Sequence, residues 1–153
     1  ADLAPGTPVL IEGPYGALTH ARRRAEGVLY LAGGIGITPL RALLEQSSHH
    51  GPSGGVATLV YRARSAVDLV HREEIDTLAE SDHIDVHYWL SEPGERGGVG
   101  DLFDGNRLID LVDDVANRDV FVCGPQPFMD AATASLTRCG VPSTFIHTER
   151  FDF

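Results

Sequence analysis

The sequence predicts an α/β protein with a doubly wound, parallel, five-stranded Rossmann-like sheet in three α/β/α layers. Short apolar or β-branched runs alternate with segments of helical periodicity along most of the chain. Most of these runs are apolar throughout, as strands covered by helices on both faces are. The 153 residues, 42% apolar and 22% charged, are enough for one substantial core.

Five runs are the expected strands, and the order expected for such a sheet is 3-2-1-4-5 with right-handed crossovers. We expect the first four to be buried on both faces. The runs are residues 28–32, 56–61, 84–90, 120–123 and 144–147.

The expected helices lie between these strands. Residues 38–46 place three leucines on one helical face, and residues 67–80 repeat apolar residues at helical spacing. Ser65, with an acid three residues later, is the expected N-cap of the second helix. A third helix, over 128–139, is expected to end at Gly140 because glycine readily adopts the left-handed conformation found after helix ends.

Residues 1–27 do not follow this alternation. Prolines and glycines interrupt them, only residues 9–12 could form a strand, and the arginines at 22–24 are expected to be a solvated connector. We therefore expect residues 1–27 to be the end of a preceding domain with a linker, and 28–153 to be the main domain.

Charge and composition exclude several functions. A net charge of −10 disfavours nucleic acid and anionic membranes, which bind basic proteins. There is no apolar run of the roughly 18 residues that span a bilayer, and no signal segment at the start. Two cysteines without C-x-x-C spacing favour a reducing compartment, and the seven histidines lack metal-ligand spacing. We expect a cytoplasmic location and assign no metal.

A glycine loop follows the first expected strand. Gly33, Gly34 and Gly36 permit a tight turn and a close approach to phosphate, and the helix beginning near Thr38 offers free N–H groups. Pro39 suits a first helical turn, where its missing N–H has no partner to lose. The loop alone is equally compatible with a turn that binds nothing.

A second glycine element, Cys123, Gly124 and Pro125, follows the fourth expected strand. In a doubly wound sheet, ligands bind at the carboxyl ends of strands, where the strand order reverses. This element should therefore face the first glycine loop across one crevice. Cys123 taken alone could equally be a small buried core residue.

Five motifs in order resemble the NAD(P)H-binding half of the ferredoxin-NADP reductase superfamily, particularly ferric-reductase-like and flavohaemoglobin-type reductase modules. In that family the loop is G-x-G-x-x-P, so the proline fits. The motifs are GPYG (13–16), LAGGIGITPLRALL (31–44), YRARSAVDLVHREEI (61–75), VCGPQPFMDA (122–131) and IHTERF (146–151).

The resemblance implies roles for individual residues. The glycine loop and Thr38 would hold the pyrophosphate and nicotinamide ribose, and Cys123 with Gly124 and Pro125 would position the nicotinamide against a flavin. Glu149 would be the acid near the flavin edge and Phe151 the aromatic covering the flavin ring, a role that Phe153 could also fill. Without the resemblance, Glu149 could be a surface acid paired with Arg150, and either aromatic could anchor the tail.

The resemblance also implies FAD, bound mainly by an adjoining domain that the chain lacks. Tyr15 resembles the final motif of the flavin-binding barrel, so residues 1–27 would be the end of that barrel. Most of the barrel is absent. The chain would then hold NAD(P)H without binding flavin tightly by itself.

The choice between NADH and NADPH stays open. Arg62 and Arg64 follow the second expected strand and are candidates for an adenosine 2′-phosphate, or are solvated charges. Where NADPH-dependent relatives often carry Ser-Arg, this chain has Ser91 followed by Glu92, whose carboxylate would repel a phosphate.

The predicted function is the nucleotide-binding module of a flavin-dependent oxidoreductase that passes hydride from NAD(P)H to FAD, and then electrons to haem, ferric iron or another acceptor. An upstream haem, transmembrane or iron–sulfur module would set the acceptor, and the chain would be cytoplasmic or the cytoplasmic portion of a membrane protein. The alternative is a non-catalytic nucleotide-binding or interaction domain. An acid and an aromatic in HTERF (147–151) favour the enzyme.

Overall fold

The computed structural model describes residues 4–10, 16, 18–50, 55–80, 83–91 and 105–149. Its centre is one sheet of five strands in the order β3-β2-β1-β4-β5, and every neighbouring pair is parallel. The predicted strand order is thus confirmed. The strands are β1 (Val28–Gly33), β2 (Ala57–Ala63), β3 (Ile84–Leu90), β4 (Asp119–Cys123) and β5 (Ile146–Glu149).

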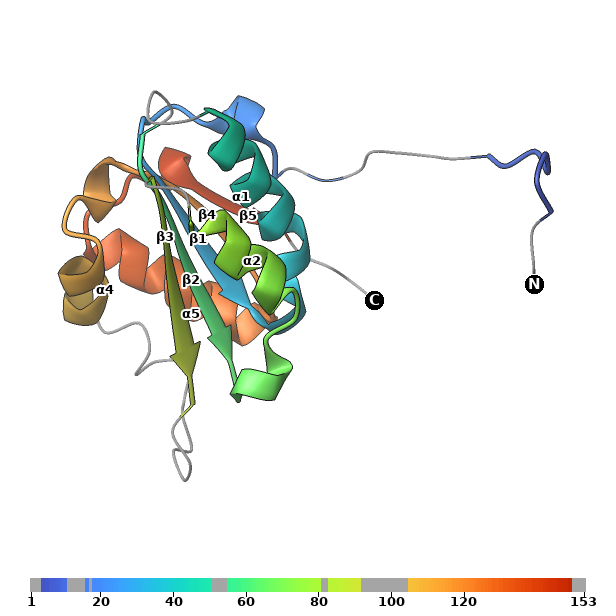
Figure 1. Ribbon diagram of the computed structural model, residues 1–153. Coiled ribbons are helices and arrows are strands. Elements are labelled where there is room, and N and C mark those ends of the chain that lie inside the picture. Colours follow the sequence, from blue (N-terminus) through green and yellow to red (C-terminus); the bar gives the residue numbers. More distant parts are fainter. Residues whose placement is uncertain are drawn as a thin grey trace.

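Helices cover both faces of the sheet and complete the predicted three layers (Figure 1). On one face lie α1 (Ile37–His50) and α2 (Arg72–Leu78). On the other face lie α4 (Gly105–Leu111) and α5 (Gln126–Arg138). Short 3₁₀ turns join these elements at His20–Arg22, Gly34–Gly36, Ala66–Asp68, Val115–Asn117 and Ser143–Phe145.

Side chains of the central strands alternate between two apolar cores. From β1, Tyr30 and Ala32 pack under α1, whereas Leu29 and Leu31 pack toward α4 and α5. Every residue of β1 and β4 is buried, as predicted for strands covered on both faces. This double burial holds the carboxyl ends of β1 and β4 rigidly beside each other.

Strand β3 differs from the prediction because it lies at the edge of the sheet. It pairs only with β2 within the described residues, and Asp85 and Leu90 are exposed. An apolar run therefore did not guarantee a strand buried on both faces. The fifth strand begins at Ile146 instead of residue 144, because residues 143–145 form a 3₁₀ turn.

The predicted helix over 67–80 is interrupted. A 3₁₀ turn occupies Ala66–Asp68, and α2 begins only at Arg72, after His71 adopts φ 60° and ψ 21°. Ser65 makes no capping bond to the backbone; its hydroxyl donates instead to the carboxylate of Asp68 at 2.8 Å. The prediction that Ser65 caps the second helix was therefore wrong: Ser65 precedes the 3₁₀ turn, and His71 precedes α2.

The end of α5 follows the prediction. Gly140 has φ +84°, its N–H donates to the carbonyl of Thr137, and the next N–H, from Val141, donates to that of Leu136. These two bonds satisfy carbonyls that the helix leaves free.

Residues 4–10 extend away from the domain and are exposed (Figure 1). Val9 and Leu10 belong to no strand, and the other two residues of the expected strand 9–12 lie outside the described residues.

Candidate functional site

The two glycine elements meet at the carboxyl edge of the sheet, as predicted. Strand β1 runs into the loop Gly33–Gly36, and the adjacent β4 ends at Cys123. A Cβ on Gly36 would lie 2.2 Å from the carbonyl oxygen of Cys123 and 2.6 Å from the nitrogen of Gly124. Only glycine at this position lets the two backbones touch.

The phenyl ring of Phe128, from the first turn of α5, fills the space beneath this junction. A Cβ on Gly33 or on Gly124 would lie 2.9 or 2.8 Å from this ring. Gly33 and Gly124 therefore let α5 pack close to the sheet. Gly36, buried against Cys123, is likewise a packing glycine.

A cleft of about 290 Å³ opens on the outer side of the junction. The structure brings five of the predicted binding residues to its walls, namely Gly33, Gly34, Arg62, Arg64 and Pro125. It adds five that the sequence did not single out, namely Ile35, Ala63, Asp68, Val70 and Phe128.

Two features of this cleft suit the binding of an anionic, nucleotide-like ligand. Gly34 has φ +54°, and no atom lies within 4 Å of where its Cβ would be, so the backbone is open to close approach. Arg62 holds its Nε buried without a hydrogen-bond partner among the described residues, while an Nη donates to Ser91 at 3.5 Å. An uncompensated buried guanidinium N–H favours an acceptor from a ligand.

The remaining predicted residues have different positions. Thr38 and Pro39 lie in the first turn of α1, directly after the glycine loop, and neither lines the cleft. Ser91 reaches the cleft only through its bond to Arg62. Tyr15 and Phe151 lie outside the described residues.

Cys123 is fully buried at the end of β4. Burial, and then the nearby carboxylate of Glu149, raises the pKa of its thiol to about 11, although a hydrogen bond with Gly124 acts in the opposite direction. The thiol is therefore protonated at neutral pH, and its S–H donates to the carbonyl of Glu149 at 3.8 Å. A protonated, buried thiol suits contact and positioning, and not nucleophilic attack.

Glu149 ends β5 and contacts the segment before the domain. Its Oε2 accepts a hydrogen bond from the N–H of Leu18 at 3.1 Å, and its carboxylate lies over Gly16. A Cβ on Gly16 would lie 2.2 Å from Oε1. The carboxylate thus lies at the carboxyl end of β5, where it holds Leu18 and lies against Gly16.

A second contact between the linker and the domain is made by His20. The ring Nε2 of His20 donates to the carbonyl of Leu43 at 2.8 Å and lies 3.2 Å from the hydroxyl of Tyr30. Burial raises the pKa of Tyr30 to about 12, so this hydroxyl remains protonated.

The third contact uses a buried carboxylate. Asp119, fully buried at the start of β4, accepts hydrogen bonds from the N–H groups of Arg24 and Ala25, each at 2.6 Å, and from His147 at 2.8 Å. The backbone at the basic cluster is therefore bound to the sheet, while Arg22 and Arg24 themselves are exposed. The linker is more firmly attached than a solvated connector would be.

The described residues contain no group of three His, Cys, Asp or Glu side chains that could hold a metal ion. None of the described helices is long and apolar enough to span a bilayer.

Comparison with known proteins identifies the family. The family described as oxidoreductase NAD-binding domain matches residues 30–134, which is more than half of the chain. The chain belongs to this family. The expected fold and the resemblance to ferredoxin reductase-type modules are thereby confirmed.

The matching regions of curated relatives are parts of longer proteins that are named as reductase components. The reductase component of propane 2-monooxygenase from Gordonia sp. strain TY-5 is 32% identical over 154 residues, which cover 97% of this chain and 44% of that protein. The ferredoxin reductase component of 3-ketosteroid-9-alpha-monooxygenase from Mycobacterium tuberculosis is 34% identical over 125 residues, 80% of this chain and 33% of that protein. The chain thus spans less than half the length of these relatives.

A solved structure supports the fold of the NAD-binding domain. The flavohemoglobin of Malassezia yamatoensis superimposes with a TM-score of 0.72 at 23% identity, over 89% of this chain and 35% of that one. This likeness shows that the described part of the chain has the fold of that structure's matching region.

Proposed function

We propose that this NAD-binding domain is the nucleotide-binding module of a flavin-dependent reductase that takes hydride from NADH or NADPH to FAD. The observation that carries the proposal is the junction of Gly36 with Cys123 and Gly124 beside an open cleft, where Gly34 presents bare backbone. The names of the relatives, reductase components of two monooxygenases, support the same class of activity.

The chain's residues divide the work between binding and positioning. Gly34 and the first turn of α1, with Thr38 and Pro39, would approach the pyrophosphate, since a helix N-terminus attracts anions. Cys123 and Pro125 would place the nicotinamide. The hydride chemistry is supplied by the nicotinamide and flavin themselves, so the protein acts by orientation and shielding.

The flavin would be held mainly by a domain preceding this chain. Residues 1–27 would be the end of that flavin-binding barrel with Tyr15, followed by the linker that the described contacts hold against the domain. Glu149 and Phe151 would lie at the flavin edge. Glu149 supports this assignment because its carboxylate holds Leu18 at the carboxyl edge of β5.

The electron acceptor would be haem, ferric iron or another acceptor, supplied by an upstream haem, transmembrane or iron–sulfur module or by a separate protein. The relatives named as reductase components of monooxygenases support an oxygenase as that partner. We infer a cytoplasmic site of action from the two cysteines, neither of which is in a disulfide. The cleft contains both Arg62 and Asp68, so charge alone permits either nucleotide: arginine favours a 2′-phosphate and a carboxylate favours a 2′-hydroxyl.

The proposal is tested on two proteins. The 153-residue chain should bind NADH or NADPH, be colourless, and fail to reduce ferricyanide with either nucleotide. Tightly bound yellow flavin with turnover would contradict the division between two domains.

In a reductase that joins the chain to its flavin domain, Cys123→Ala should slow flavin reduction in stopped-flow by about 10- to 100-fold, because misplacing reacting atoms by 1 Å costs that much. The Kd for nucleotide should change by less than about threefold. Cys139→Ala, which alters the half-buried second thiol at the C-terminal end of α5, is the control and should leave both quantities unchanged. Equal losses in rate and affinity for Cys123→Ala would assign the thiol a structural role.

A further inference from the structure

The outer wall of the cleft is the segment that joins β2 to α2. Asp68 and Val70 line the cleft from this segment, and His71 follows at once. His71 has φ 60° and ψ 21°, and it is the only non-glycine residue with positive φ in the part of the chain that the structure describes. Such a conformation persists only where neighbouring groups impose it, and it is frequent at ligand-binding segments.

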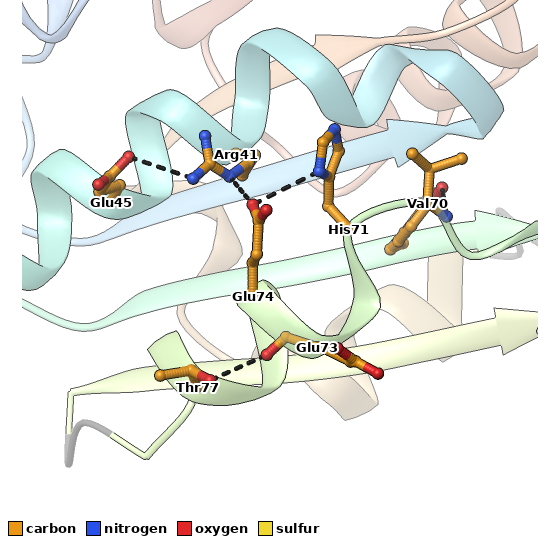
Figure 2. A network of polar contacts seen from close by, with 8 residues as sticks. Arg41, Glu45, Val70, His71, Glu73, Glu74 and Thr77 are labelled. Carbon is orange, nitrogen blue, oxygen red and sulfur yellow. Dashed lines mark hydrogen bonds and ion pairs between the residues drawn. The ribbon is translucent and has the colours of Figure 1, made fainter.

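A charged contact between two helices holds His71 from outside the cleft. Glu74, in the first turn of α2, lies with Oε2 3.4 Å from Nδ1 of His71 and 2.5 Å from Nε of Arg41 (Figure 2). Arg41 belongs to α1, two residues beyond Pro39, and its Nη2 also lies 3.7 Å from Oε2 of Glu45. Glu74 therefore connects the wall of the cleft to the helix that begins at the glycine loop.

The inner side of the same wall is fixed by a buried hydroxyl. Tyr61 of β2 accepts a hydrogen bond from the N–H of Val70 at 3.2 Å and donates to the carbonyl of Asp68 at 3.4 Å. Tyr61 itself is fully buried. The segment 68–71 is thus held by the sheet on one side and by α1 on the other.

We propose that His71 and Glu74 are positioning residues for nucleotide binding: through Arg41 they set the distance between the wall formed by Asp68 and Val70 and the glycine loop opposite. This inference rests on the proposed function, because it assigns the wall to the same nucleotide. The wall follows β2, and β2 pairs Arg62 with Gly33, so the part of the ligand it receives is the ADP-ribose half.

The test measures the Kd of the 153-residue chain for NADH, NADPH and ADP-ribose by titration calorimetry at 15 °C, together with thermal unfolding. His71→Ala should raise the Kd for ADP-ribose about 3- to 10-fold, because alanine tolerates left-handed backbone poorly and lacks the ring nitrogen. His71→Asn should recover most of the affinity, since asparagine enters that region readily. Glu74→Gln should raise the Kd about threefold without any change of backbone preference.

Glu73→Gln is the matched control because it removes the same charge one residue away. Glu73 is exposed and contributes its backbone carbonyl to Thr77, and in Figure 2 its side chain points away from Arg41. The Kd of the Glu73→Gln variant for ADP-ribose should equal that of the unaltered chain. If His71→Ala fails to fold, the test is completed by Glu74→Gln, Arg41→Gln and the variant that carries both changes. Because the two residues act through one contact, the rise in Kd of the double variant should be less than the sum of the two single effects, expressed as free energies.

The outcomes separate the two claims. An unaltered chain that binds neither nucleotide nor ADP-ribose at millimolar concentration overturns the proposed function, and this inference with it. An unaltered chain that binds while the His71 and Glu74 variants match Glu73→Gln overturns only the positioning role. Lower unfolding temperatures with unchanged Kd would likewise make the contact purely structural and overturn the inference.

Discussion

Alanine at Gly36 is the most direct test of the contact between the two glycine elements. Gly36 is buried, and its added Cβ would lie 2.2 Å from the Cys123 oxygen, 2.4 Å from the carbonyl carbon and 2.6 Å from the Gly124 nitrogen. All three are backbone atoms at the end of a fully paired strand, so no side chain can rotate to make room. The loop and β4 must separate to accept the methyl group.

The expected cost follows from the size of the overlap. Overpacking a well-filled core costs about 1–3 kcal/mol, and displaced backbone in a central strand belongs at the upper end. For a domain of this size, each kcal/mol lowers Tm by about 2–4 °C. Gly36→Ala should therefore lose about 3 kcal/mol and about 6–12 °C.

Gly34→Ala provides the comparison within the same loop. Gly34 has φ +54° but no atom within 4 Å of its added Cβ, so alanine there meets only the left-handed backbone cost of about 1 kcal/mol. Its methyl group would, however, extend into the open cleft. We expect a fall in Tm of about 2–4 °C and a weakening of nucleotide binding that exceeds the loss of stability.

Urea unfolding followed by Trp89 fluorescence, differential scanning fluorimetry and nucleotide titration give the three quantities for each variant. The reasoning would be refuted if Gly34→Ala destabilised the chain as much as Gly36→Ala does. It would also be refuted if Gly36→Ala had an unchanged Tm, since the two glycine elements would then not be in contact.

Two more changes test groups buried beside the site. Asp119→Ala leaves His147 and two linker N–H groups without their acceptor. The free energy of unfolding, measured in urea, should therefore fall by about 3–5 kcal/mol. A loss below about 1 kcal/mol would show that the linker is not anchored at Asp119. Burial raises the Cys123 pKa from its ordinary 9.0 to about 11, so its contribution to stability is complete below pH 9 and is lost as the pH rises toward 11. The free energy of unfolding should therefore decline more steeply between pH 8.5 and 10.5 in the unaltered chain than in Cys123→Ala, and parallel declines would contradict the raised pKa.

The sequence was sufficient for the arrangement of the sheet because the signals involved are local and redundant. Continuous apolar runs such as 28–32 and 120–123 are typical of strands buried on both faces, and glycines directly after them locate the carboxyl edge. The same reasoning placed Cys123 opposite the glycine loop, where the contact with Gly36 confirms it.

Features that depend on a single backbone angle could not be predicted. Apolar spacing continues across residues 67–80, so the pattern predicts one helix, yet the left-handed backbone of His71 divides the segment. The contacts around His71 are tertiary as well as local: Tyr61 of β2 binds the neighbouring Val70, and Glu74 joins His71 to Arg41 of α1. Asp68 and Val70 reach the cleft because of that division, which is why the pattern did not identify them.

Contacts between distant segments were also hidden. Asp119 is bonded to N–H groups 94 and 95 residues earlier in the chain, and Glu149 to one 131 residues earlier. No local pattern around either acid predicts such partners. The helix α4 was missed for another reason, since its seven residues, Gly105–Leu111, provide too few turns for a periodic signal.

The hydrogen bond between Leu18 and Glu149 has a consequence for anything joined to the chain ahead of it. Residues 18–25 are held to the domain at three points, and Leu18 lies beside the end of β5, the strand adjacent to the one that ends at Cys123. If the proposed flavin domain is joined directly ahead of this held segment, the short connection would give effective concentrations in about the millimolar range between the joined groups. A cofactor on such a domain would therefore be joined at the edge of the sheet where β4 and β5 end, beside Cys123 and Glu149.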